Sequence, residues 1–499
     1  MKVLIANRGE IAVRIIRACR ELGFPTVSVY SEADRAALHV LYADQSVEIG
    51  PAPSRESYLR IDRIIEAAKK TGAEAIHPGY GFLAENANLP DACEAAGIIF
   101  IGPSASSIRA MGSKTEARQR MKAAGVPVVP GLTEAVTGYA EIEAFAIEVG
   151  FPVMVKASAG GGGKGMRMVQ RMEDLKASFE RVQSEAGSFF GDPAVYAEKV
   201  VTSPRHIEVQ VLGDKHGNLI HLGERECTLQ RRHQKVIEEC PSPVVDAELR
   251  ERLGAMAVKA ARAVDYYSTG TIEMLMDADR NFYFLEMNTR LQVEHPVTEI
   301  VTGIDLVKEQ IRVAQGLSLS VRQEDVLHRG HAIECRVYAE NPFRGFAPSP
   351  GLIRYLALPQ GPGVRNENGI YSGYTVPIHY DPLLSKLITS GATREEAISR
   401  MRRALLEYRV EGIETSIPFY SMLLEDADFR AARFDTGFID QFLSRISLHS
   451  PTGQPQIDAA LIAAAILHFE ESQNVVLPNE TLSSWKDAGR VEATGGRKW

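Results

Sequence analysis

The sequence predicts an α/β protein that begins with a layered parallel sheet and ends in a strand-rich region. Three observations support this class. Short apolar runs alternate with segments of helical periodicity up to about residue 113. A smaller segment with a run of glycines follows at about 131–203, and strand-like runs dominate from about residue 320. The 499 residues are enough for roughly two to four domains.

The composition is that of an ordinary globular protein, and it narrows the function classes. Hydrophobic residues make up 45% of the chain and the net charge is −8, which argues against nucleic acid or an anionic membrane as the partner. The longest apolar run, at about 459–467, is too short for a membrane span, and the start of the chain lacks a signal-peptide core. The cysteines are scattered and form no C-x-x-C pair. We therefore expect a cytoplasmic protein.

The first segment is expected to alternate strands and helices. Residues 2–6 form a short apolar run typical of a buried strand, and a helix follows with Ile11, Ile15 and Leu22 at helical spacing. Gly23 and Pro25 end that helix. Further strands are predicted at 26–30, 74–77 and 98–101, with a helix at 62–70.

The glycine run joins two predicted strands, 151–156 and 166–169. Gly160, Gly162 and Gly165 satisfy G-x-G-x-x-G, but a dinucleotide fingerprint needs a helix after the loop. The pattern instead predicts a hairpin flap whose backbone amides can approach phosphates closely. Lys156 ends the first strand, where a lysine is costly unless it meets an anion.

The C-terminal part is predicted to be rich in strands. Strands are expected at 332–338, 351–356 and 374–378, followed by a helix at 393–407. After about residue 448 a linker precedes an alanine-rich helix at 458–470.

The most informative stretch is a predicted hairpin at 271–287. If Asp279 and Arg280 form a two-residue loop, Glu273 lies directly opposite Glu286. Two facing carboxylates repel each other, and a divalent cation such as Mg²⁺ or Mn²⁺ would relieve that repulsion. A solvated pair of acidic strands is the alternative for these residues taken alone.

Polar residues then occupy every second position. In an extended chain Glu286, Asn288, Arg290, Gln292 and Glu294 would all point to one side, and the chain must bend if they share one site. His295 precedes Pro296 and is expected to be extended as well. Two acids, two amides and a guanidinium on one face indicate a metal and anion site.

Two further candidates carry positive charge. Residues 230–235, with the sequence Gln-Arg-Arg-His-Gln-Lys, are either a solvated basic run or a set of donors for phosphate and carboxylate oxygens. Lys114 is a weaker candidate, since such a lysine is usually solvated.

Four motifs together resemble the biotin carboxylase family of ATP-grasp enzymes. They are A-N-R-G-E-I-A at 6–12, H-P-G-Y-G-F at 77–82, the run at 230–235 and the run at 286–296. The resemblance extends from residue 1 to about 445. It departs from the family at Ala159, where another glycine is common, and in the tail.

The resemblance implies a fold, a reaction and a set of site residues. The fold is an ATP-grasp fold with a Rossmann-like domain at 1–113, an ATP-grasp domain at 114–319 with a mobile lid at 131–203, a C-terminal domain at 320–447 and a tail of unassigned role at 448–499. ATP would phosphorylate bicarbonate to carboxyphosphate, which carboxylates N1′ of biotin, with two Mg²⁺ or Mn²⁺ ions expected. The implied nucleotide-binding residues are Lys114, Lys156, Gly161, Gly162, Gly163, Glu198, His206, Gln230 and His233. The implied metal ligands are Glu273, Glu286 and Asn288. The implied bicarbonate pocket comprises Lys235, Arg290, Gln292 and Glu294, with Glu294 as general base, and Arg336 on another strand stabilises the biotin enolate. Val293 is a further implied cofactor-binding residue.

The partners are implied in the same way. The Met-Lys-Met tripeptide of a biotin acceptor does not occur, so biotin is expected on a separate biotin carboxyl carrier protein, with carboxyltransferase subunits completing the enzyme. A homodimer is the family expectation. Acetyl-CoA carboxylase, and with it fatty acid biosynthesis, is one setting; propionyl-CoA and pyruvate are equally open as acceptors.

Three other functions share parts of this pattern. Another ATP-grasp ligase, of the carbamoyl phosphate or purine-pathway type, shares the nucleotide chemistry. A nicotinamide oxidoreductase is disfavoured because Asn7-Arg8-Gly9 lacks the fingerprint and the glycine run opens no helix. A nucleic-acid binder acting through Arg231 and Arg232 is disfavoured by the net charge of −8.

Overall fold

The computed structural model describes residues 1–132, 134–158, 165–190, 192–232, 234–446 and 461–469. The chain divides into two units, Met1–Ile446 and Ser447–Trp499. In the second unit, residues 461–469 are helical, within the predicted helix at 458–470 whose ends lie outside the described residues. No helix in the described ranges has the length and apolarity needed to cross a membrane.

The first segment folds as the predicted parallel layer. Its five strands lie in the order β3-β2-β1-β4-β5, all parallel where paired. The strands are β1 (Val3–Ile5), β2 (Thr26–Ser31), β3 (Gln45–Gly50), β4 (Ala75–His77) and β5 (Ile99–Phe100). The helices are α1 (Gly9–Glu21), α2 (Leu38–Tyr42), α3 (Ile61–Thr71), α4 (Asn88–Ala95) and α5 (Ala105–Gly112). Val3 and Ile5 pack in one core cluster and Leu4 in another, so both faces of β1 are covered, which explains its unbroken apolar run.

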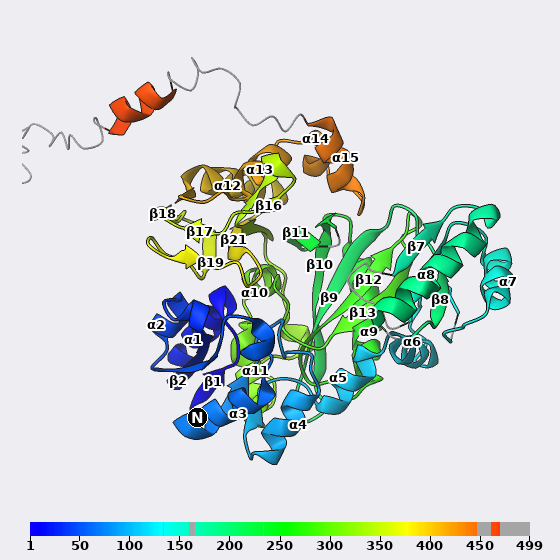
Figure 1. Cartoon of the computed structure of the whole chain (residues 1–499), viewed down its shortest axis with the longest axis horizontal. Helices are drawn as coiled ribbons and strands as arrows, with labels where there is room; N and C mark the ends of the chain where they lie inside the picture. Colours follow the sequence, from blue (N-terminus) through cyan, green and yellow to red (C-terminus); the bar gives the residue numbers. More distant parts are fainter. Residues whose placement is uncertain (133, 159–164, 191, 233, 447–460, 470–499) are drawn as a thin grey trace, which may run out of the picture. The chain divides into compact units, whose positions relative to one another are not determined.

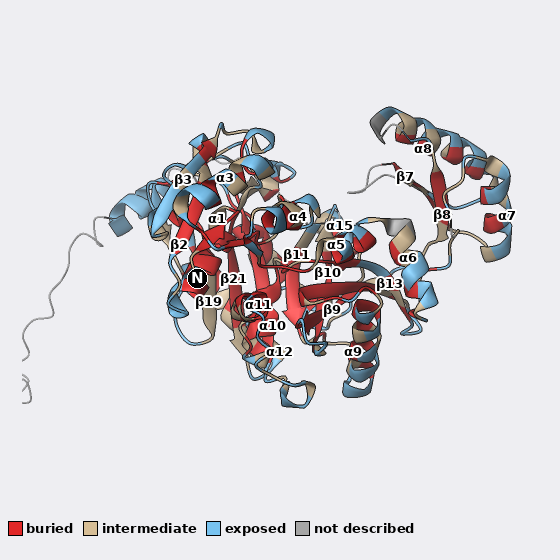
Figure 2. Ribbon diagram, turned by 90° about the horizontal axis from the view of Figure 1, so that it is seen from below, coloured by how far each residue is buried: buried red, intermediate tan, exposed pale blue. Residues whose placement is uncertain are grey.

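The predicted lid has a small sheet and a core of its own (Figure 2). Its strands are β6 (Val153–Ala157), β7 (Met166–Val169) and β8 (Val195–Lys199), in the order β7-β6-β8. Its helices are α7 (Tyr139–Val149) and α8 (Leu175–Phe190), and α6 (Lys114–Ala123) precedes them. Lys156 pairs directly with Met166 across the antiparallel β6–β7 pair. The glycine run therefore connects strand to strand as predicted, although residues 159–164 themselves lie outside the described part.

One antiparallel sheet of eight strands forms the body of the protein and continues into the C-terminal region (Figure 1). Its order is β13-β12-β9-β10-β11-β14-β21-β19. The strands are β9 (Arg205–Gly213), β10 (Leu219–Arg231), β11 (Gln234–Cys240), β12 (Ser268–Met276), β13 (Phe282–Asn288), β14 (His331–Tyr338), β19 (Val364–Asn368) and β21 (Leu383–Gly391). The helices are α9 (Ala247–Arg262), α10 (His295–Thr302), α11 (Leu306–Ala314), α12 (Arg394–Glu407), α13 (Ile417–Leu423), α14 (Ala427–Arg430) and α15 (Phe438–Arg445).

The predicted C-terminal elements are confirmed in part. The helix predicted at 393–407 is α12, with Thr393 as its N-cap accepting from the amide of Glu396. The strand predicted at 351–356 is broken into two, and that at 374–378 is shorter than expected. The short strands are β15 (Glu340–Asn341), β16 (Ala347–Pro348), β17 (Gly351–Leu352), β18 (Tyr355–Ala357), β20 (Thr375–Val376) and β22 (Arg409–Glu411).

Candidate active site

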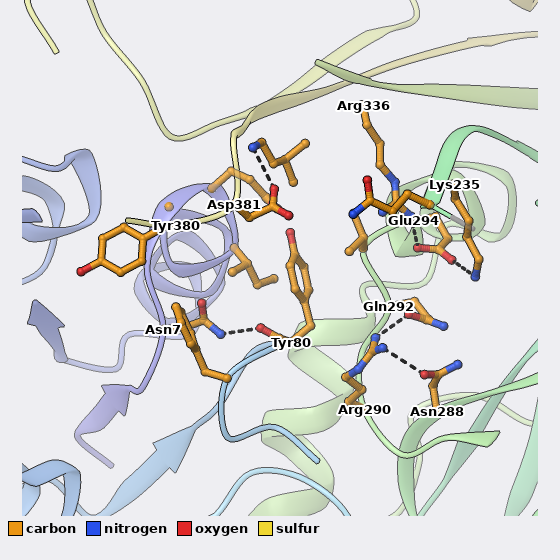
Figure 3. Close-up of a pocket in the computed structure, with 18 of the residues that line it drawn as sticks. Asn7, Tyr80, Lys235, Asn288, Arg290, Gln292, Glu294, Arg336, Tyr380 and Asp381 are labelled. Atoms are coloured by element: carbon orange, nitrogen blue, oxygen red, sulfur yellow. Dashed lines mark hydrogen bonds and ion pairs between the residues drawn. The ribbon is translucent and has the colours of Figure 1, made fainter. Parts of the chain in front are cut away.

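A cavity of about 810 Å³ collects side chains from three parts of the fold. The first segment contributes residues 7–11 and 80–82, and the predicted lid contributes Lys156 and Met166. The eight-stranded sheet and the loop that follows β13 supply most of the charged groups (Figure 3). Among the predicted site residues, those lining the cavity are Lys156, His206, Gln230, Lys235, Glu273, Glu286, Asn288, Arg290, Gln292, Val293, Glu294 and Arg336.

The β12–β13 hairpin places Glu273 opposite Glu286, as the sequence predicts. The two-residue loop that led to this prediction is wrong, however. Asp277 donates its amide to the carbonyl of Asn281, so the loop has three residues, with Arg280 at a φ of 62°. A bulge between Glu273 and Met274 shifts the register by one residue and restores the pairing.

The run from 286 to 294 is not one extended strand: β13 ends at Asn288 and the chain bends, as the sequence requires if these residues share one site. Residues 289–294 form a loop, and His295 begins α10 with proline in the first turn, which suits a helix start. The bend brings the alternating residues together: Arg290 donates to Asn288 Oδ1 at 2.9 Å and to Gln292 Oε1 at 2.5 Å. Gln292 donates to Glu273 Oε1 at 3.0 Å.

Lys235 forms ion pairs with three carboxylates of the site. Its Nζ lies 2.5 Å from Glu208, 2.8 Å from Glu273 and 2.6 Å from Glu294. Burial alone would lower the pKa of Lys235, but these carboxylates outweigh it and raise the pKa well above its usual value. Burial would likewise raise the pKa of Glu294, but Lys235 and Arg336 hold it well below the usual value. Glu294 is therefore an ionised carboxylate at neutral pH.

Arg336 is joined directly to Glu294. Its Nη2 donates to Glu294 Oε2 at 2.8 Å (Figure 3). Its Nε donates to Glu238 Oε1 at 2.6 Å. The sequence assigned Arg336 and Glu294 to opposite sides of the reaction because they lie on different elements. The structure places the two side chains in contact, since one carboxylate bridges Lys235 and Arg336, and their division of roles stays a prediction.

The predicted nucleotide-binding residues are only partly described. Lys156 forms an ion pair with Glu198, so the anion that this lysine meets is a carboxylate of the protein itself. His206 Nε2 lies 3.1 Å from Glu273 Oε2, and Gln230 bonds to the other ring nitrogen of His206. The backbone of Lys114 begins α6, but its side chain, Gly161, Gly162, Gly163 and His233 lie outside the described residues.

The residues of the basic run at 230–235 do not all lie in the cavity. Gln230 and Lys235 line the cavity. Arg231 instead lies 3.9 Å above the ring of Phe346 and pairs with Glu340. Arg231 therefore donates to a carboxylate of the protein itself and is not among the residues that line the cavity.

Sequence reasoning missed Glu208, one of the three carboxylates that hold Lys235, and Arg225 behind it. Glu208 is buried on β9 and lies between Lys235 and Arg225, whose Nε donates to it at 2.5 Å. Arg225 is fully buried and also donates to Gln210 at 2.7 Å. The sequence does contain a signal for Glu208. His206, Glu208 and Gln210 alternate with apolar residues along one strand, so the three polar side chains lie on the same face of the sheet.

The donor set fits a hard divalent cation. Glu273 and Glu286 face each other across the hairpin, and Asn288 adds an amide close to Glu273. Carboxylate and amide oxygens are the ligands that Mg²⁺ and Mn²⁺ prefer. Ligand atoms of His206, Glu208 and Glu273 also lie within 4.8 Å of one another.

The chain matches family models along most of its length. "Biotin carboxylase, N-terminal domain" matches residues 1–108, "Carbamoyl-phosphate synthase L chain, ATP binding domain" matches 113–322, and "Biotin carboxylase C-terminal domain" matches 334–441. Biotin carboxylase 1 of Bacillus subtilis is 55% identical over 442 residues, covering 88% of this chain and 98% of the relative. A pyruvate carboxylase subunit of Methanothermobacter thermautotrophicus is 56% identical over 442 residues, covering 88% and 90%.

Solved structures agree with this match. A biotin carboxylase beta-gamma-ATP complex from Campylobacter jejuni has a TM-score of 0.85 and 48% identity, covering 88% of this chain and 98% of that one. The biotin carboxylase domain dimer of Hydrogenobacter thermophilus 2-oxoglutarate carboxylase, solved with MgADP, ADP and bicarbonate, has a TM-score of 0.84 and 47% identity, covering 89% and 99%.

The parallel layer, the small hairpin segment and the charged cavity define an ATP-dependent ligase of the ATP-grasp class. Within that class, this chain belongs to the biotin carboxylase family. The tail beyond residue 446 lies outside the stretch that the family models match.

Proposed function

We propose that this chain is the biotin carboxylase subunit of a multi-subunit carboxylase. It transfers the γ-phosphoryl group of ATP to bicarbonate, releasing ADP and forming carboxyphosphate. The carboxyl group then passes to N1′ of biotin on a separate carrier protein, and phosphate leaves. The observation that carries the proposal is a single buried carboxylate, Glu294, held between two cations inside a cavity that also contains the facing acids of the hairpin.

In this proposal Glu294 is the general base that takes the bicarbonate proton. Its carboxylate is ionised and lies beside Lys235, a cation that attracts the bicarbonate anion. Arg290, fixed by Asn288 and Gln292, holds the bicarbonate oxygens, and Val293 completes the pocket.

Arg336 stabilises the negative charge that develops on the ureido oxygen of biotin. Arg336 also donates to Glu294, so its guanidinium lies beside the proposed base. In this proposal both half-reactions therefore depend on the pair formed by Arg336 and Glu294.

The other assignments follow the donor types. Glu273, Glu286 and Asn288 hold two Mg²⁺ or Mn²⁺ ions, which neutralise phosphate charge when bound. The nucleotide is held by Lys114, Lys156, Gly161, Gly162, Gly163, Glu198, His206, Gln230 and His233. The division into domains at 113, 319 and 447 is part of the same proposal, and the family-model boundaries support it.

The assembly is proposed from the relatives. The Hydrogenobacter relative is a domain dimer, which supports a homodimer here. A carrier protein and carboxyltransferase subunits complete the cytoplasmic enzyme, and the carboxyltransferase selects the acceptor. One relative belongs to a pyruvate carboxylase, so acetyl-CoA carboxylase and fatty acid biosynthesis are one setting among several.

Bicarbonate-dependent ATP cleavage that free biotin accelerates tests the function. We expect ADP release to require both bicarbonate and Mg²⁺. A carbamoyl phosphate or purine-pathway ligase would show no response to biotin, and that result would refute the proposal. Co-purification from the native cell then identifies the carboxyltransferase.

A further inference from the structure

A line of charged side chains crosses the sheet beside the cavity. On neighbouring strands Arg336 pairs directly with Lys386, and Lys386 pairs directly with Glu367. Direct cross-strand partners project from the same face of a sheet, so the three charges lie side by side. Lys386 is fully buried, unlike Lys156 and Lys235, which line the cavity.

Lys386 contacts the loop that carries the proposed base. Its Nζ donates to the carbonyl oxygen of Val293 at 2.8 Å. That carbonyl belongs to the peptide bond between Val293 and Glu294, and the planar peptide group includes the Cα atom of Glu294. Holding the oxygen therefore fixes the backbone from which the Glu294 side chain projects.

The charge partner of Lys386 comes from a distant element. Glu10, in the first turn of α1, places Oε2 3.3 Å from the Lys386 ammonium. Within the described part of the chain, neither oxygen of Glu10 accepts a hydrogen bond. Burial raises the pKa of Glu10 to about 7, although Lys386 opposes that shift. The attraction between Glu10 and Lys386 therefore offsets little of the free-energy cost of burying the two charges.

A buried ammonium in such a place is costly, and an apolar side chain of similar length would fill the space. The Lys386 ammonium contacts a carboxylate of α1 and a carbonyl oxygen of the 289–294 loop, and it lies 5.7 Å from the centre of the Tyr80 ring. The second contact leads to Glu294, which in turn binds Arg336, the cross-strand neighbour of Lys386.

We propose that Lys386 is a positioning residue for the carboxylation reaction: its hydrogen bond to the Val293 carbonyl, made with Glu10 as counter-charge, sets the position of Glu294 against Lys235 and Arg336. This inference rests on the function proposed above, because it takes Glu294 as the base. Lys386 itself does not touch the reacting atoms.

The test compares Lys386→Met with the double variant Glu10→Gln/Lys386→Met. The single change leaves the Glu10 carboxylate buried without its partner, whereas the double change removes both charges and protects the fold. Lys308→Met is the matched control, since Lys308 pairs with Glu21 at the surface of α11. A displacement of about 1 Å costs about 100-fold in rate, so we expect the kcat of bicarbonate-dependent ATP cleavage to fall by about that factor in the double variant. The KM for ATP should stay unchanged.

Amide hydrogen exchange across residues 289–294 gives a readout independent of activity. We expect faster exchange there in the double variant and wild-type exchange in Lys308→Met. A folded double variant with wild-type kcat and wild-type exchange would overturn the proposal, because Lys386 would then be only a counter-charge. If the wild-type protein itself lacks bicarbonate-dependent ATP cleavage, the proposed function fails, and the exchange comparison still decides whether Lys386 holds the loop.

Discussion

Replacing Glu294 by glutamine removes the proposed base while changing few contacts. The carboxylate accepts from Lys235 at 2.6 Å and from Arg336 at 2.8 Å, and the amide nitrogen of glutamine can replace neither acceptor. Each cation keeps another carboxylate: Lys235 keeps two, and Arg336 keeps Glu238. We therefore expect a loss of about 1–3 kcal/mol in stability, below the about 3–5 kcal/mol lost when a buried ion has no partner.

The expected loss of activity is much larger. A general base contributes about 10²–10⁴-fold, so Glu294→Gln should lower both bicarbonate-dependent ADP release and carboxybiotin formation by that factor. The assay follows both products at saturating bicarbonate. Glu309→Gln is the matched control, because Glu309 is also buried but accepts from Ser320 instead of lining the cavity. Normal carboxylation by a folded Glu294→Gln protein would refute the role of base.

Three further predictions follow from the same geometry. Lys156→Gln should raise the KM for ATP and leave the fold intact; an unchanged KM with normal turnover would remove Lys156 from the nucleotide site. Arg336→Ala should lower biotin carboxylation more than biotin-independent ATP cleavage, and should lower the latter too because Glu294 loses a partner; equal losses in both rates would contradict the ureido role. Burial would raise the pKa of Glu239, but Arg394 outweighs it and holds the pKa at about 2. The native state therefore gains stability above the unfolded pKa of about 4.3, a gain lost as pH falls toward 2. Urea unfolding should show Glu239→Gln less stable than wild type by about 3 kcal/mol at pH 7, with the gap narrowing below pH 4.5; a gap that does not change with pH would contradict this.

Local signals were enough to predict four of the five strands of the first segment, all but β3, and the facing acids. The apolar run of β1 and the glycine after α1 identify buried parallel strands and a helix end without any long-range information. Glu273 and Glu286 were paired correctly because a bulge and a longer loop displace the register by equal amounts in opposite directions. The alternation of polar and apolar residues alone predicts neither the bulge nor the three-residue loop.

The centre of the site could not be predicted from periodicity. Lys235 meets carboxylates 27, 38 and 59 positions away along the chain, and these contacts depend on the order of strands in the eight-stranded sheet. Arg336 reaches Glu294 because the chain bends after Asn288; the alternating pattern requires such a bend for one shared site but does not say where it falls. Family resemblance supplied the residues, but not the contacts among them.

The fate of one bicarbonate oxygen tests the proposed reaction most directly. Bicarbonate labelled with oxygen-18 is mixed with the enzyme, ATP, Mg²⁺ and free biotin, and the phosphate released is analysed by mass before the label exchanges with water. Transfer of the γ-phosphoryl group to bicarbonate predicts one labelled oxygen in each phosphate, because the carbon–oxygen bond of carboxyphosphate breaks when the carboxyl group passes to biotin. Phosphate that carries an oxygen from water instead would show that ATP is hydrolysed without activating bicarbonate, and would contradict the function proposed for this cavity.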